Sequence, residues 1–149
     1  VVCMHEEDLP KLQELYENGV ANGVQQLEIV DAKRLHELGA VFVDVRPTRQ
    51  WSWGHVWGAV HLDLAGNFAE MGNQAWPRQV PLVVYCDSEV CPRSALAAQM
   101  LVGWGYTQVY YYREGFFAWQ LLDMPQGRGL KGEQVAFRAL VAPAVAGLE

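Results

Sequence analysis

Residues 81–100, PLVVYCDSEVCPRSALAAQM, contain the pattern that decides the fold class. The apolar run before Cys86 is short and β-branched, which predicts a buried strand. The stretch from Arg93 is rich in Ala, Leu, Gln and Met, which predicts a helix. Cys86 therefore lies in a loop between a strand and a helix N-terminus, where backbone N–H groups and the helix dipole favour a thiolate. A buried cysteine is more commonly an inert small hydrophobe, but this position favours a reactive one.

Similar short apolar runs recur along the chain and alternate with helical patterns. They predict strands at residues 26–30, 41–45, 59–62 and 108–112. Helices are predicted from Asp31, as N-cap, to about Leu38 and over residues 116–122, whereas residues 64–76 are ambiguous. This alternation predicts an α/β fold with a mostly parallel central sheet and helices on both faces. Ligands of such sheets bind at the carboxyl ends of the strands, where Cys86 and the Asp44–Arg46 segment both lie.

The patterns divide the chain into three parts. Residues 1–25 are expected to form an N-terminal helical extension, and residues 26–125 the α/β domain. Residues 126–149 contain several glycines and then an Ala/Val-rich stretch, and are expected to form a tail that either adds a peripheral helix or is loosely ordered. Its last two residues, Leu148 and Glu149, resemble a cloning remnant.

The composition is that of an ordinary globular protein and excludes several classes of function. Of the 149 residues, 51% are hydrophobic, and the formal charge of −6 comes without a Lys/Arg cluster. Nucleic-acid binding and attachment to anionic membranes are therefore not expected. Three cysteines in a chain of this length do not form a disulfide scaffold. The absence of a signal-peptide pattern favours a cytoplasmic location, but an exported one stays open because the chain begins at Val1 rather than at a methionine.

Three segments, taken in order, carry a resemblance to a known family. They are Asp44-Val45-Arg46 with Gly54-His55-Val56-Trp57-Gly58-Ala59, Tyr85-Cys86 with Arg93-Ser94-Ala95-Leu96-Ala97-Ala98, and Gly105-Tyr106-Thr107-Gln108-Val109-Tyr110 with Gly115-Phe116-Phe117-Ala118-Trp119. They resemble the D-V-R…G-H-I-x-G-A signature, the active-site loop with its helix, and the G-Y-x-x-V…G-G-x-x-A-W ending of the rhodanese (thiosulfate sulfurtransferase) domain family. The resemblance covers residues 26–125 and implies a single rhodanese-like domain.

The resemblance implies a sulfurtransferase with Cys86 as its catalytic residue. The thiolate would take a sulfane sulfur from a donor such as thiosulfate and pass it, as a persulfide, to cyanide, a small thiol or a protein thiol. No metal or organic cofactor is implied. The anionic persulfide needs a ring of N–H donors. The expected substrate-binding loop consists of Asp87, Ser88, Glu89, Val90, Cys91, Pro92, Arg93 and Ser94.

The resemblance also implies supporting roles for several residues around the loop. Arg93 is expected to bind the anionic donor or to fix the loop, and the Ser94 hydroxyl to cap free N–H groups at the helix start. Asp44 and Arg46 are expected to brace the site with hydrogen bonds and an ion pair. His55 is expected to pack and bond rather than to act as a base.

Three features depart from the family pattern. Six residues, 87–92, separate Cys86 from Arg93, where the family has four. Asp87 and Glu89 in this longer loop would raise the pKa of Cys86 and repel thiosulfate unless they point outward. Glu114 replaces the first glycine of the family's G-G pair.

Two alternative functions stay open. Cys91 could resolve a persulfide or sulfenate on Cys86 into a disulfide, and the chain would then be a non-catalytic or redox-sensing interaction module. A phosphatase or arsenate reductase is disfavoured by the acidic loop and by Tyr85, where those oxyanion enzymes place a histidine. Three tryptophans are predicted to lie either in the core or at a partner surface, namely Trp51, Trp53 and Trp57.

Overall fold

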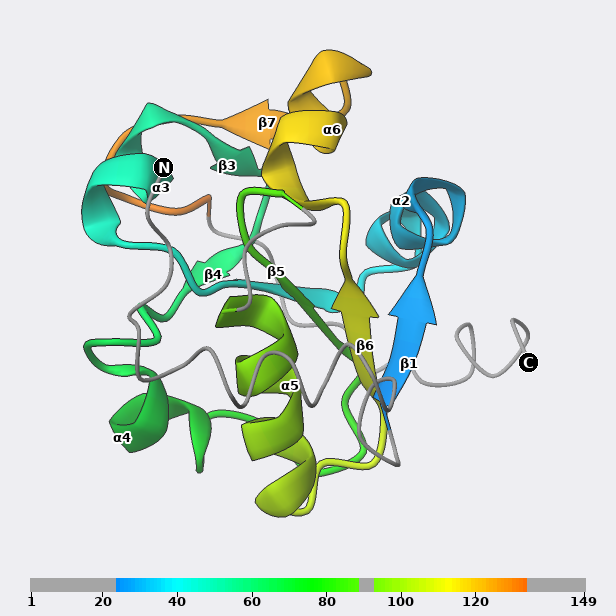
Figure 1. Cartoon of the computed structure of the whole chain (residues 1–149), viewed down its shortest axis with the longest axis vertical. Coiled ribbons are helices and arrows are strands. Elements are labelled where there is room, and N and C mark those ends of the chain that lie inside the picture. Colours follow the sequence, from blue (N-terminus) through cyan, green and yellow to red (C-terminus); the bar gives the residue numbers. More distant parts are fainter. Residues whose placement is uncertain (1–23, 89–92, 134–149) are drawn as a thin grey trace.

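The computed structural model describes residues 24–88 and 93–133. Its centre is a five-stranded parallel sheet with the strand order β1-β6-β5-β2-β4 (Figure 1). The strands are β1 (Val24–Leu27), β2 (Val41–Asp44), β4 (Val60–His61), β5 (Leu82–Tyr85) and β6 (Val109–Tyr112). A second, antiparallel sheet pairs β3 (His55–Val56) with β7 (Gln126–Gly127).

Helices cover both faces of the parallel sheet. One face packs against α4 (Phe68–Gly72) and α5 (Arg93–Gly103), and the other against α2 (Ile29–Glu37), α3 (Thr48–Trp53) and α6 (Gly115–Leu121). Successive strand residues point to opposite faces, so Val84 joins the core under α5 while Val83 and Tyr85 join the other core. Because both faces are buried, the strands are continuous apolar runs rather than alternating ones.

The register of the sheet brings two loops together. Asp44 is aligned with Tyr85, and Tyr85 with Tyr112, so the central strands end at one edge of the sheet. Just beyond that edge the Val45 N–H donates to the Tyr85 carbonyl at 3.4 Å. The chain after β2 and the chain after β5, which begins with Cys86, therefore leave the sheet side by side.

The predicted parallel sheet with helices on both faces is confirmed, and one predicted strand is partly wrong. The strand predicted at 26–30 ends at Leu27, and Ile29 opens α2. Glu28, not Asp31, precedes that helix. The cause is a distant contact, because the Ile29 N–H donates to Oε1 of Glu114 at 3.1 Å. This bond satisfies a helix-start amide through a partner that the local sequence does not contain.

Two described strands extend beyond the stretch 26–125 assigned to the domain. β1 begins at Val24, and β7 covers Gln126–Gly127. The ambiguous stretch 64–76 contains α4. Residues 1–23 and 134–149, which hold the predicted N-terminal helix and most of the tail, lie outside the described residues. Within the described part of the chain, no helix is long and apolar enough to cross a membrane.

The core beneath α5 gives a test of the fold. Leu101 is fully buried in it, whereas Leu121 on α6 is 83% exposed. Leu101→Ala is expected to lower the free energy of unfolding by about 2–5 kcal/mol, because it removes apolar contacts and leaves a cavity. Leu121→Ala, the matched control, is expected to change it by about 0.5 kcal/mol or less. Urea unfolding measures both, and equal effects would contradict this assignment of the core.

Candidate active site

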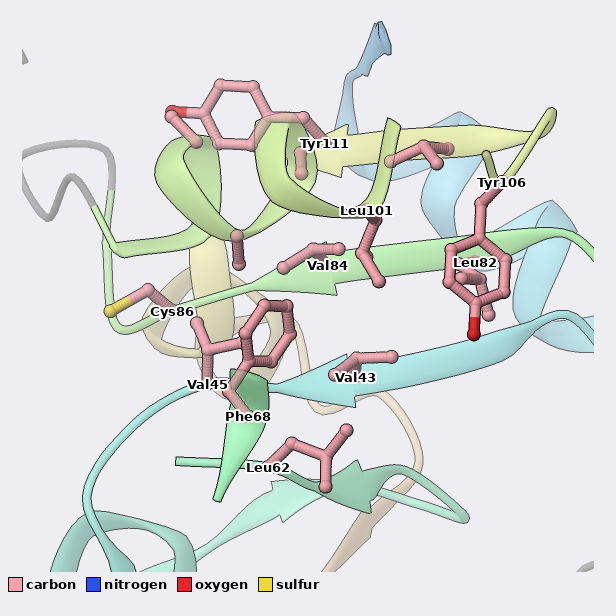
Figure 2. Close-up of a cluster of buried hydrophobic side chains, with 14 of the residues drawn as sticks. Val43, Val45, Leu62, Phe68, Leu82, Val84, Cys86, Leu101, Tyr106 and Tyr111 are labelled. Atoms are coloured by element: carbon pink, nitrogen blue, oxygen red, sulfur yellow. The ribbon is translucent and has the colours of Figure 1, made fainter. Parts of the chain in front are cut away.

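Cys86 directly follows β5, and its side chain is 1% exposed (Figure 2). It belongs to the same core cluster as Ala95 in the first turn of α5. Cys86 is disulfide-bonded in this structure, and its partner lies outside the described residues. A disulfide sulfur is not a nucleophile, so this structure holds the cysteine in an oxidised, shielded form.

The backbone of the loop's first residues is fixed by the other helix of the site, α6. The Phe116 N–H donates to the Cys86 carbonyl at 2.8 Å, and the Phe117 N–H to the Asp87 carbonyl at 2.9 Å. These are N–H groups of the first turn of α6, which have no partner inside their own helix. They hold Cys86 and Asp87 in one position relative to the sheet.

The segment before α6 explains one departure from the family pattern and one agreement with it. Gly115 has φ +77°, and a Cβ there would lie 2.5 Å from the Asp87 carbonyl carbon, so a side chain at this position would push the loop away. Glu114, which stands in place of the other glycine, accepts the bond from the Ile29 N–H described above. Its side chain thus serves the start of α2 rather than the loop.

Arg46 is the centre of a buried polar network beside the loop. It is 2% exposed, and its Nη2 donates to Asp44 Oδ2 at 2.7 Å. The Nη1 atom donates to Asp87 Oδ1 at 3.2 Å, and Nη2 also reaches the Gly54 carbonyl at 2.5 Å. One guanidinium therefore ties the end of β2, the cysteine loop and the turn before β3 together.

The orientation of Asp87 differs from the prediction. The sequence predicted that this carboxylate would oppose a thiolate unless it pointed outward. It instead points inward, is 1% exposed, and has Arg46 as its counter-charge. Burial alone would lower the pKa of Arg46, but the carboxylates of Asp44 and Asp87 outweigh burial and raise it, so the guanidinium keeps its charge. Glu89 lies outside the described residues.

Tyr85 extends the network under the loop. Its hydroxyl donates to Asp44 Oδ2 at 2.6 Å and accepts a bond from the Val56 N–H at 3.0 Å. Burial, followed by the charge of Asp44, raises the pKa of Tyr85, so the phenol remains a donor. The position where oxyanion enzymes place a histidine is thus occupied by a structural tyrosine that points into the opposite core.

His55 is fully buried, and both of its ring nitrogens are in use. Its Nδ1 lies 3.0 Å from the Trp51 carbonyl, and its Nε2 lies 3.0 Å from Glu133 Oε2. Nothing in this arrangement leaves a nitrogen to act on a substrate. Trp51 is buried, whereas Trp53 and Trp57 are 65% and 49% exposed, so the tryptophan cluster divides between core and surface.

Two polar side-chain atoms in the first turn of α5 are buried and have no hydrogen-bond partner among the described residues. They are Nε of Arg93 and Oγ of Ser94. The Ser94 hydroxyl therefore does not cap the helix, contrary to the expectation from the sequence. Residues 89–92 of the expected loop, including Cys91, lie outside the described residues.

Sequence reasoning assigned no site role to three residues that hold this network. Tyr85 bonds Asp44, His61 Nε2 donates to the Arg46 carbonyl at 2.7 Å, and Glu133 bonds His55. Each partner is either distant in sequence or part of an apolar run, so no local sequence motif predicts these bonds. Among residues 24–88 and 93–133, no group of three or more His, Cys, Asp or Glu residues is placed to hold a metal ion.

Comparison with known proteins gives one family. The family model described as "Rhodanese-like domain" matches residues 28–122 of this chain. Proteins named thiosulfate sulfurtransferase GlpE from Pseudomonas fluorescens and Pseudomonas syringae are 36% and 38% identical over 89 residues, which is 60% of this chain and 78% and 80% of theirs.

Solved structures give the same fold. A thiosulfate sulfurtransferase from Pseudomonas aeruginosa is 24% identical with a TM-score of 0.58, over 70% of this chain, which spans only 20% of that protein. A protein of unknown function from Rhodopseudomonas palustris, described as a possible tyrosine phosphatase, is 26% identical with a TM-score of 0.61, over 76% of this chain and 89% of its own.

The Arg46 network can be tested by removing its cation. Arg46→Gln leaves the buried carboxylates of Asp44 and Asp87 without their counter-charge, and is expected to cost about 3–5 kcal/mol of stability. Arg49→Gln is the matched control, since Arg49 is an exposed arginine over the Trp53 ring, and is expected to cost about 1 kcal/mol or less. Urea unfolding under reducing conditions measures both, and a small effect of Arg46→Gln would show that the network is not stabilising.

Proposed function

Since the chain belongs to the rhodanese-like domain family, we propose that it is a sulfurtransferase that carries sulfane sulfur as a persulfide on Cys86. The observation that carries the proposal is the placement of this cysteine. It stands at the carboxyl end of a central parallel strand and beside the first turn of α5. Strand ends of this kind are where α/β sheets bind ligands.

The first turn of α5 supports binding of an anionic sulfur donor. The Arg93 side chain is 8% exposed and Ser94 is 1% exposed, and each has a buried polar atom without a protein partner. Leaving buried donors unpaired costs free energy, which an anion at this position would recover. The helix dipole favours negative charge at the same place. Thiosulfate and the persulfide are both anions of suitable chemistry.

The chemistry needs a thiolate and no separate proton donor. The Cys86 thiolate attacks the outer sulfur of thiosulfate, the S–S bond of the donor breaks, and sulfite leaves with the bonding electron pair. The acceptor, cyanide or a thiolate, then attacks the terminal persulfide sulfur and releases the Cys86 thiolate. No net oxidation occurs across the two steps. This agrees with the absence of a free histidine nitrogen at His55.

Persulfide formation on the reduced protein tests the proposal. The disulfide is first reduced, because the thiol is required, and the protein is then incubated with thiosulfate and freed of excess reagent. Intact mass and peptide mapping are expected to show one added sulfur atom on Cys86. Cys86→Ser should gain none, while Cys3→Ser, the matched control, should gain it as the wild type does. With cyanide as acceptor, the wild type and Cys3→Ser should form thiocyanate and Cys86→Ser should not. A wild-type protein that gains no sulfur would rule the proposal out.

A redox-sensing module is the second candidate, and the disulfide at Cys86 favours it. In this case the disulfide itself is the functional state. Thiol titration after graded oxidation separates the two candidates. A disulfide that forms readily, together with no sulfur gain by the reduced protein, would make the redox module the better assignment. Sulfur gain by the reduced thiol would favour the transferase.

A further inference from the structure

Glu133 lies beyond the stretch that matches the family and is bonded into the site's support. Its Oε1 accepts from the Gly58 N–H at 2.8 Å, and its Oε2 lies 3.0 Å from His55 Nε2. The side chain is 13% exposed, and His55 is fully buried. A Cβ on Gly127 would lie 2.7 Å from His55 Nε2. There is no room for a side chain at this position, so only glycine allows β7 to lie this close to His55.

Contacts on three sides hold the His55 ring in place. Its Nδ1 lies 3.0 Å from the Trp51 carbonyl, and its Nε2 lies 3.0 Å from Glu133 Oε2. The ring also stacks on the Trp51 indole at 3.5 Å between centroids and 8° between planes.

The pKa of Glu133 indicates that its side chain bonds its partners as a carboxylate. Burial alone would raise it, but the bonds from the Gly58 N–H and from His55 outweigh burial and lower it. Glu133 is therefore a carboxylate at neutral pH, not a protonated acid that could donate to the ring.

The residues on either side of His55 contact the Arg46 network directly. The Gly54 carbonyl accepts from Arg46, and the Val56 N–H donates to the Tyr85 hydroxyl, which in turn bonds Asp44. The turn at residues 54–58 is thus the shared partner of two side chains that brace the Cys86 loop. A contact that fixes His55 therefore also fixes the neighbouring Gly54 carbonyl and Val56 N–H.

We propose that Glu133 is a positioning residue of the site, whose bonds to His55 and to the Gly58 N–H fix the 54–58 turn against Arg46 and Tyr85. For its effect on catalysis the inference rests on the proposed sulfurtransferase function. Its structural part does not. Five other ionisable groups lie around this turn besides Arg46. Asp44 and Asp87 bond Arg46, and Tyr85 bonds Asp44. His61 stacks on Trp51 at 5.0 Å, and His36 Nε2 donates to the Trp57 carbonyl at 2.7 Å.

Two variants separate the charge of Glu133 from its contacts. In Glu133→Gln the amide oxygen can still accept from Gly58, and the amide nitrogen can donate to an unprotonated His55 Nε2. This variant is expected to keep the turn in place. Glu133→Ala removes both bonds and is expected to release the turn. Glu70→Gln on α4, an exposed carboxylate, is the matched control.

Nitrogen-15 NMR of the reduced protein measures the position of the turn without any activity. Exchange of the Arg46 Nε–H with solvent should be near the wild-type rate in Glu70→Gln and Glu133→Gln, and about tenfold faster in Glu133→Ala. Unchanged Arg46 exchange in Glu133→Ala would overturn the proposal.

The pH dependence and the kinetics complete the test. Because the pKa of Glu133 is lowered on folding, its stabilising effect is present above its ordinary pKa of about 4.5 and is lost as the pH falls through the lower folded value. The stability gap between wild type and Glu133→Ala should therefore be present at neutral pH and narrow as the pH falls below about 4.5. If the protein transfers sulfur, Glu133→Ala should lower kcat/KM for thiosulfate about tenfold and Glu133→Gln should largely restore it. If it does not, the NMR results alone decide the inference.

Discussion

The guanidinium of Arg46 joins three parts of the chain that the parallel sheet only brings near one another. It bonds Asp44 at the end of β2, Asp87 in the cysteine loop, and the carbonyl of Gly54 before β3. Without a counter-charge, two buried carboxylates beside Cys86 would be costly and would oppose the ionisation of its thiol in the reduced protein. With Arg46 between them, the same carboxylates become fixed points of the structure. The position of the loop start, the turn and the tyrosine under the sheet all depend on this one cation.

The backbone and the side chain of Cys86 are held by opposite layers of the molecule. Its carbonyl is fixed by the first turn of α6, while its side chain continues the strand alternation into the core beneath α5. This division fixes the backbone of the cysteine independently of α5. Among the described residues, Nε of Arg93 and Oγ of Ser94 in the first turn of α5 are buried without a hydrogen-bond partner. The sulfurtransferase proposed above would use these two atoms to bind its anionic donor, while α6 holds the backbone of Cys86 in place.

The sequence allowed the parallel sheet, most of its strands and the place of Cys86 to be predicted, because these follow from runs of apolar residues and from helix signals. The errors and omissions share a cause. Glu114 bonds Ile29 across 85 positions, and Glu133 bonds His55 across 78, so no local pattern could reveal either contact. The inward orientation of Asp87 depends on Arg46, 41 positions earlier, and a charged residue in a loop is ordinarily expected to face water. Polar contacts between distant segments, rather than hydrophobic periodicity, are what the sequence did not disclose.

The close approach of Gly115 to Asp87 fixes the base of the cysteine loop. The carbonyls of Cys86 and Asp87 are anchored to α6, and α5 begins at Arg93. The position of the Cys86 sulfur is therefore set by the sheet and by α6, and not by the length of the chain between Asp87 and Arg93. For protein engineering these are two separate design variables, because a substitution between the two anchors leaves both anchors unchanged.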